Sequence, residues 1–431
     1  MKRSLLSLAA GLWLAAPASA DDLRPRVDAA ARGLEPRVIE WRRDLHQHPE
    51  LSNREFRTGA LVGDHLEALG LEVRREVAHT GVVGVLRGGR PGPVVALRAD
   101  MDALPVTEAT GLPFASKVRT SYLGREVGVM HACGHDGHTA VLMGVAELLA
   151  GLRAELRGSV VFLFQPAEEK PPPGEEGGAR LMLKEGAFDD PRPEVIFGLH
   201  VTHRQPVGTI AVTPGGAMAS SDNLKILVRG SQTHAAYPWR GVDPIAVASR
   251  IVLALHAIPA RQVDTRIPSV VSIGAIHGGV RSNIIPAEVE MLGTIRALDR
   301  DMRFELHEKV KRSIAGIAAS AGAEANVDIV LGYPITYNNP ALLQRMRPTL
   351  DRVSDRSVVE SLPVTGAEDF AFYQEQIPGL YFWVGVRSPD VAFADAAPNH
   401  SPGFFLDERG LELGIRALAH LALDYMQGET D

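Results

Sequence analysis

Residues 94–102 read Val94-Val95-Ala96-Leu97-Arg98-Ala99-Asp100-Met101-Asp102, an apolar run that ends in charged side chains. A continuous run of β-favouring residues is typical of a strand that is covered on both faces. Residues 160–164 and 195–197 have the same character. Between the first two runs, apolar residues recur at the spacing of an amphipathic helix, at Val141, Val145, Leu148 and Leu152. The order strand, helix, strand predicts an α/β fold with a mostly parallel sheet.

The pattern changes between about residues 217 and 333. In chain order the predicted elements are strand 223–228, helix 244–258, strand 269–276, strand 290–295, helix 302–321 and strand 325–331. This β-α-β-β-α-β order predicts a small α+β domain of the ferredoxin-like type. We expect residues 217–333 to be inserted into a larger domain made of residues 21–216 and 334–431, with a further strand of that domain at 380–386.

The first twenty residues predict an export signal. Lys2 and Arg3 give a basic start, residues 5–16 are almost entirely apolar, and Ala18-Ser19-Ala20 is a small-residue cleavage site. The apolar core is too short for a spanning helix, which makes an uncleaved anchor the less favoured alternative. We expect a secreted or periplasmic protein whose mature chain begins near Asp21, with no later membrane span.

Length, net charge and cysteine count limit the class of protein and the molecules that it can bind. The chain has 431 residues, of which 45% are hydrophobic, and this suits two or more domains with a substantial core. Its formal net charge of -7 argues against nucleic acid, because phosphate binding requires a basic face. A single cysteine excludes an internal disulfide and leaves a buried, reactive or metal-binding thiol.

Three predicted strands end in residues that can carry chemistry. They lead into Asp100, into the pair Glu168-Glu169, and into His200. Ligands of open α/β sheets bind at the carboxyl edge of the strands, so these side chains are expected to lie close together. Residues 131–138 place three histidines and the only cysteine in eight positions before the helix, a composition that favours metal binding.

Each of these features has an ordinary structural explanation when it is taken alone. A buried histidine is usually a hydrogen-bonded core residue, a Glu-Glu pair is usually solvated, and a lone cysteine is usually a small hydrophobe. Their joint occurrence at strand ends favours a single metal site.

Several motifs, taken in order, resemble the M20 metallopeptidase clan. They are Asp44 to Glu50, Ala96 to Pro105, Cys133-Gly134-His135-Asp136-Gly137-His138, Glu168-Glu169, Gly198-Leu199-His200, Gly366 to Phe370 and Asn399-His400-Ser401. The chain is most similar to the amidohydrolase branch, which includes hippurate hydrolases, auxin-conjugate hydrolases and N-acyl-amino-acid amidohydrolases. The resemblance implies a zinc-peptidase-like catalytic domain with an inserted lid and dimerisation domain, and a homo-oligomer built on dimers.

The resemblance also implies roles for individual residues. The metal ligands correspond to Cys133, His135, Glu169, His200 and His400. Five ligands exceed one tetrahedral zinc site, so one or two divalent ions are expected, with zinc favoured and manganese, cobalt or nickel left open. The general base corresponds to Glu168 and the oxyanion-stabilising histidine to His234, in the subunit's own site or in that of its neighbour. Asp100, where other M20 peptidases have the aspartate of His-x-Asp, would orient a ligand or the metal. Asn283 and Arg296 are candidates for binding the substrate carboxylate, although a turn residue and a surface charge explain them equally well.

The expected activity is hydrolysis of the amide bond of an N-acyl or N-aroyl amino acid. Hippurate-like amides fit the branch, and bulky aroyl-phenylalanine amides of the ochratoxin type stay open. A dipeptidase or carboxypeptidase of the same clan is the first alternative, and a periplasmic binding protein without catalysis is the second. Four aromatic residues are candidates for the wall of a substrate pocket, although positions in the core or at an interface explain them equally well: Phe114, Tyr237, Trp239 and Phe372.

Overall fold

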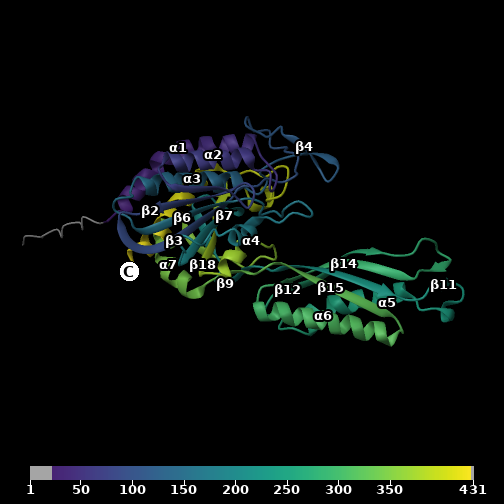
Figure 1. Ribbon diagram of the computed structural model, residues 1–431. Coiled ribbons are helices and arrows are strands. Elements are labelled where there is room, and N and C mark those ends of the chain that lie inside the picture. The colour runs from purple at the N-terminus through teal and green to yellow at the C-terminus, as the bar shows by residue number, and fades with distance from the viewer. Residues whose placement is uncertain (1–21, 429–431) are drawn as a thin grey trace, which may run out of the picture.

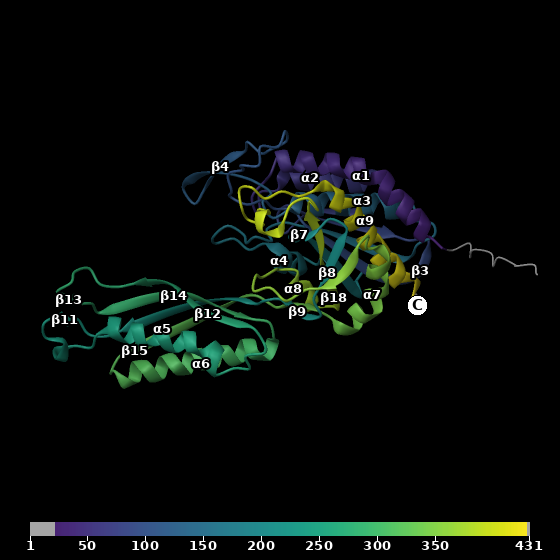
Figure 2. The same cartoon turned by 180° about the vertical axis from the view of Figure 1, so that it is seen from behind.

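The computed structural model describes residues 22–428, so the predicted signal peptide at residues 1–20 lies outside the described part. Figure 1 shows a large α/β domain joined to a smaller, elongated domain that projects from it. The view from behind shows the same separation (Figure 2).

The large domain is built on an eight-stranded sheet in the order β1-β2-β6-β3-β7-β18-β8-β17. Its strands are β1 (Glu72–Val77), β2 (Gly81–Arg87), β3 (Arg90–Asp100), β6 (Arg157–Gln165), β7 (Val195–Pro206), β8 (Thr209–Val212), β17 (Ser357–Glu360) and β18 (Gly379–Arg387). The central strands β6, β3, β7 and β18 run parallel to one another, and β8 is parallel to β17. The predicted mostly parallel α/β sheet is therefore confirmed.

Helices cover both faces of this sheet. The face that carries Val95 and Leu97 packs against α1 (Arg24–Gln47), α2 (Phe56–Ala68), α3 (His135–Ala150), α7 (Pro340–Val353) and α9 (Leu411–Gln427). The opposite face, which carries Ala96, packs against the short helices α4 (Gly178–Lys184) and α8 (Ala371–Gln374). Adjacent residues of β3 thus enter different cores, as the two-residue period of a strand requires.

The helix predicted around residues 141–152 is present as α3, but it is not amphipathic. Almost all of its residues are buried, because α1 and α9 pack over the side that would otherwise face solvent. A helix that is apolar all round is typical of such a central position. A hairpin of β4 (Arg119–Tyr122) and β5 (Arg125–Gly128) projects from the same domain.

The smaller domain contains a four-stranded antiparallel sheet in the order β12-β14-β10-β15. Its elements are β10 (Ser221–Arg229), α5 (Pro244–Arg261), β12 (Ser269–His277), β14 (Glu288–Ala297), α6 (Arg300–Ser320) and β15 (Glu324–Tyr333). This is the connectivity of the predicted β-α-β-β-α-β unit, with a separate core between the helices and the sheet. The short strands β11 (Thr233–His234) and β13 (Ile284–Ile285) pair at its far end (Figures 1 and 2).

Among the described residues, α5 is one helix long and apolar enough to cross a membrane by length and composition alone. Its apolar residues Val247, Ile251, Leu255 and Ile258 are buried in the core of the small domain. Packing in this core accounts for these four residues, whereas Ile245 and Leu253 of the same helix are exposed.

Two chain segments connect the domains. They pair as β9 (Gly215–Met218) and β16 (Thr336–Asn338). Beside them Asp222 accepts hydrogen bonds from Arg303 and from the backbone of Gly332, and His307 Nε2 lies 2.8 Å from its carboxylate. Burial opposes ionisation of Asp222, but Arg303 and His307 outweigh it and lower its pKa to about 2.

We expect Asp222→Ala to lower the free energy of unfolding of the small domain by roughly 3 kcal/mol, because it leaves Arg303 buried without its counter-ion. Since the pKa of Asp222 is lowered on folding, its contribution is complete above the unfolded pKa of about 4 and is lost as the pH falls towards 2. Urea unfolding at neutral and acid pH measures both effects. A difference between wild type and variant that stays constant down to pH 2 would contradict this role.

Candidate metal centre

The cysteine-histidine segment turns sharply before α3. Gly134 separates Cys133 from His135 and has a φ of 96°, in the left-handed region that favours glycine. A Cβ at this position would lie 2.3 Å from Cγ2 of Val201, so a larger residue would also collide with β7. The tight turn places Cys133 and His135 against the strand that carries His200.

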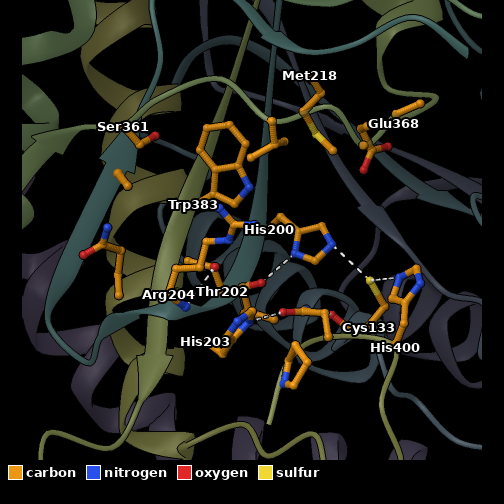
Figure 3. Close-up of a pocket in the computed structure, with 18 of the residues that line it drawn as sticks. Cys133, His200, Thr202, His203, Arg204, Met218, Ser361, Glu368, Trp383 and His400 are labelled. Carbon is orange, nitrogen blue, oxygen red and sulfur yellow. Dashed lines mark hydrogen bonds between the residues drawn. The ribbon is translucent and has the colours of Figure 1, made fainter. Parts of the chain in front are cut away.

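Cys133 Sγ is the centre of a cluster of donor atoms. It lies 3.2 Å from His200 Nε2 and 3.2 Å from His400 Nε2. His400 Nε2 lies 2.9 Å from Glu169 Oε1. Two sets of three donors, with all atoms in each set within 4.8 Å of one another, share the cysteine: Cys133 with His135 and His200, and Cys133 with Glu169 and His400. The structure therefore brings together all five predicted ligands (Figure 3 shows the cysteine with His200 and His400).

The side chains of this cluster fit a metal ion. His135 Nδ1 lies 2.8 Å from the carbonyl of Asp102, whereas its buried Nε2 has no hydrogen-bond partner among residues 22–428. His200 Nδ1 lies 2.6 Å from the carbonyl of Val201, which leaves Nε2 free to act as a ligand atom. Burial lowers the pKa of His200 well below its usual range and raises the pKa of Cys133. Burial opposes protonation of His135, but Asp100 outweighs it and raises the pKa of His135, and Cys133 and Glu169 raise the pKa of His400 to about 10. An ion held here needs neutral imidazoles and a thiolate, so its binding would release these protons.

Asp102 is a positioning residue that the sequence interpretation did not single out. Its Oδ1 lies 3.2 Å from His135 Nδ1, and its carboxylate accepts hydrogen bonds from the backbone N–H groups of Glu168 and Glu169. Ser52 Oγ donates to it at 2.6 Å. One carboxylate thus orients a predicted ligand and the backbone of the Glu-Glu pair, a role typical of groups behind a metal site.

Asp100 contacts a different histidine. Its Oδ1 lies 2.6 Å from His138 Nδ1, and His138 Nε2 accepts a hydrogen bond from the backbone of Val201. Asp100 lies 3.8 Å from His135 Nε2. Burial opposes its ionisation, but Arg98 at 2.5 Å holds the pKa of Asp100 well below its usual range. Asp100 therefore stays charged, and through His138 it is linked to the backbone of Val201, the residue that follows His200.

Only one of the three histidines in residues 131–138 belongs to a donor set with Cys133. Both nitrogens of His138 are already engaged, as described above. Burial lowers the pKa of His131 to about 4, and neither of its ring nitrogens has a hydrogen-bond partner in the described part of the chain. His46 of α1 is buried, with Nδ1 2.8 Å from Asp136.

Glu168 lies beside the donor cluster and is buried. Burial raises the pKa of Glu168 well above its usual range, and the carboxylates of Glu368 and Glu169 add to this effect. The buried guanidinium of Arg98 contacts Glu368 at 2.9 Å and Asp369 at 3.0 Å, which offsets the accumulated negative charge. A buried carboxyl group with a raised pKa, next to a cluster of metal-binding donors, is suited to general acid–base chemistry.

Comparison with known proteins assigns the family. Residues 96–424 match the model for peptidase family M20/M25/M40. The chain belongs to this family. It is similar to thermostable carboxypeptidase 2 of Saccharolobus solfataricus (41% identity over 94% of this chain and 99% of the relative) and to N-acetylcysteine deacetylase of Bacillus subtilis (39%, 91% and 98%). It also resembles the crystal structure of YXEP from Bacillus subtilis, described as a dinuclear metal-binding peptidase of family M20, with a TM-score of 0.78 and 37% identity over 92% of this chain and 99% of that one.

The resemblance inferred from the sequence is thus confirmed, and the chain is an M20 metallohydrolase that acts on amide bonds. The alternative of a binding protein without catalysis does not fit this assignment. The roles of individual residues remain predictions.

The predicted site residues of the small domain lie apart from the metal centre. His234 and Asn283 are neighbours at its far end, where the backbone of Ala235 donates to the carbonyl of Asn283. Both views place this end away from the large domain (Figures 1 and 2). Arg296 lies towards the other end of the domain, because the adjacent Ala297 pairs with Ser220 at the connecting segments. Within one subunit of this M20 hydrolase, these residues do not meet the cluster.

A cavity of about 630 Å³ adjoins the metal centre. This cavity is not lined by any of the four aromatic residues that the sequence offered as candidates: Phe114, Tyr237, Trp239 and Phe372. Phe114 packs instead under Arg42 and Arg43, and Phe372 packs against Tyr333. Trp383 lines this cavity instead. It lies within the apolar run of β18, so the sequence alone did not distinguish it from a core residue.

Proposed function

We propose that the protein hydrolyses the amide bond of N-acyl and N-aroyl amino acids to a carboxylic acid and a free amino acid. The observation that carries the proposal is the buried carboxyl of Glu168 beside five metal-binding side chains, at the wall of a cavity large enough for an acyl group. The relative named as an N-acetylcysteine deacetylase supports an N-acyl amino acid as the substrate. Peptide cleavage, as in the relative named as a carboxypeptidase, is the second candidate.

In this proposal Cys133, His135, Glu169, His200 and His400 hold one or two divalent ions, with zinc favoured over manganese, cobalt and nickel. When bound, such ions activate a water molecule and polarise the scissile carbonyl. Glu168 takes the proton of the attacking water and returns it to the departing amine. Asp102 keeps His135 Nε2 directed at the cluster.

A release assay tests the proposal. We expect free amino acid to appear from a panel of N-acyl amino acids, faster than from matched dipeptides, and to be abolished by a chelator. Faster release from the dipeptides would favour the peptidase. Absence of chelator-sensitive release from both panels would contradict the proposal.

We further propose an exported homodimer in which the far end of the small domain completes the neighbouring subunit's site. His234 would stabilise the oxyanion in the neighbouring subunit's site, and Asn283 would bind the substrate carboxylate in that same site. Arg296 of the subunit that holds the substrate would bind the same carboxylate. The support is geometric: His234 and Asn283 share one end of the small domain, away from their own metal centre (Figures 1 and 2).

Mixing two inactive variants tests this arrangement. Glu168→Gln and His234→Ala should each lose most activity, by on the order of 100-fold. After subunit exchange half of the dimers are mixed, and one site in each mixed dimer has both residues, so activity should return to about a quarter of wild type. If the subunits are shown to exchange and the mixture still has no activity, His234 acts in its own subunit's site or has no part in catalysis.

A further inference from the structure

The cavity beside the metal centre has a floor made of neighbouring strands. His200, Thr202 and Arg204 occupy alternate positions of β7 and therefore point to the same face of the sheet. Trp383 of β18 is the direct partner of His200, and Ala211 of β8 is paired with Trp383 on the other side. All five residues line the cavity, so a group that leaves the metal centre along this face meets the indole of Trp383 first (Figure 3).

The wall above this floor is apolar and exposed. Leu362 is 87% exposed there, and one side of the cavity is formed by Ser361, Leu362, Val364, Gly366 and Ala367. Met218 of β9 lines the cavity next to Val364, with which it forms a β-bridge. An apolar side chain held in solvent at the edge of a concave, apolar surface is typical of a site that is covered by a ligand.

Charge decides which half of the substrate this cavity accepts. In an N-acyl amino acid, the α-carboxylate lies two bonds from the nitrogen of the scissile amide. At the inner end of the cavity the charged groups outside the donor cluster are the carboxyls of Glu168 and Glu368, with Glu368 held by the hydroxyl of Tyr381 at 2.6 Å. Arg98, which offsets the charge of Glu368, is buried and does not line the cavity. An α-carboxylate placed at this end would therefore find no counter-ion outside the donor cluster, whereas an uncharged acyl group needs none.

Arg204 lines the cavity from the far part of β7. Its backbone lies four residues beyond His200, about 13 Å further along the strand at the usual rise of ~3.3 Å per residue. Its side chain is exposed, and among residues 22–428 no carboxylate forms an ion pair with it. The guanidinium is therefore available to an anionic or polar group at the far end of a long acyl chain or a substituted ring.

We propose that this cavity is the acyl subsite and that it selects an aromatic acyl group, stacked on Trp383 and covered by Leu362, with Arg204 favouring an acidic substituent at the distal end of the ring. The inference rests on the proposed function, because it names the acyl half of the same substrate. The volume of about 630 Å³ far exceeds the needs of an acetyl group and lies within the ~300–1,000 Å³ of pockets that bind drug-sized ligands.

The test compares kcat/KM for four substrates: N-acetyl-alanine, N-benzoyl-alanine, N-(4-carboxybenzoyl)-alanine and N-acetyl-phenylalanine. Wild type should prefer the benzoyl to the acetyl substrate by on the order of 10-fold or more, as expected when an apolar group fills an apolar pocket. Leu362→Ala and Trp383→Leu should each reduce this benzoyl-to-acetyl ratio several-fold, roughly 3- to 10-fold. Leu362 is exposed, so its variant tests the subsite even if the Trp383 variant folds poorly.

Two further variants separate specificity from general damage. Arg204→Gln should lower the ratio of 4-carboxybenzoyl to benzoyl substrate by about 3-fold, and added salt should reduce the same ratio in wild type. Leu253→Ala, at an exposed leucine of α5 outside the cavity, should leave every ratio at its wild-type value.

The possible failures are distinct. If neither the acetyl nor the benzoyl substrates are hydrolysed, the proposed function fails and the acyl subsite fails with it. If they are hydrolysed but the benzoyl-to-acetyl ratio is unchanged in both cavity variants, the subsite assignment alone is wrong. If those variants instead reduce the preference for phenylalanine over alanine among the acetyl substrates, the cavity holds the amino-acid half.

Discussion

Glu168→Gln is expected to lower kcat by about 100-fold or more while the protein keeps its fold and its metal. The amide of glutamine has the shape of the carboxyl group but cannot accept the proton of the attacking water. The loss should fall on kcat and kcat/KM alike, because the missing proton transfer acts only in the transition state.

The surroundings of Glu168 explain why the variant should fold. Its contacts with Asp102 and with the hydroxyl of Tyr333 are made by its backbone N–H and carbonyl, which the substitution retains. Replacing the carboxyl by a neutral amide also removes an acid from a buried group that already includes Glu368. Metal content and the thermal unfolding midpoint should therefore match wild type.

Glu155→Gln is a matched control, because this glutamate pairs with Arg26 on the surface and lies outside the cavity. It should keep wild-type turnover. Turnover close to wild type in Glu168→Gln would remove Glu168 from the role of general base.

Two of the three strand ends at the site were predicted from the sequence, because an apolar run stops there at a polar or charged residue. Asp100 closes β3, and the Glu168 loop follows β6, which ends at Gln165. His200 was expected beyond the end of its strand, yet β7 continues to Pro206 because Val201 and Thr202 keep pairing with β18. In a sequence, a polar residue inside a strand cannot be told from the end of that strand unless the neighbouring strand with which it pairs is known.

Other features depended on contacts between distant segments. Asp102 stood two residues from Asp100, but its role appears only when residues 135, 168 and 169 converge on its carboxylate. Trp383 looked like one more apolar residue of a buried strand until the sheet order placed it beside His200. The elements of the small domain followed from their periodicity, whereas the separation of His234 from its own metal centre is set by how the two domains are joined (Figures 1 and 2).

The donor cluster makes a second strong prediction, that Cys133 and His400 differ in how much metal their loss removes. Cys133 belongs to both sets of three donors, whereas His400 belongs to one. If two ions bind, Cys133→Ala should reduce the affinity of both, and His400→Ala should release one and retain the other with His135 and His200. Loss of a thiolate and an imidazole ligand should also abolish most activity, since each ion needs its full set of ligands.

Metal analysis of the purified proteins, titrated with zinc after removal of metal by a chelator, measures the two stoichiometries directly. His48→Ala is the matched control: His48 is an exposed histidine whose Nδ1 lies 2.9 Å from the carbonyl of Asp44, and its loss should leave metal content unchanged. Wild-type stoichiometry and affinity in Cys133→Ala would exclude the cysteine as a ligand. Equal losses in the two variants would show instead that the two ions bind only together.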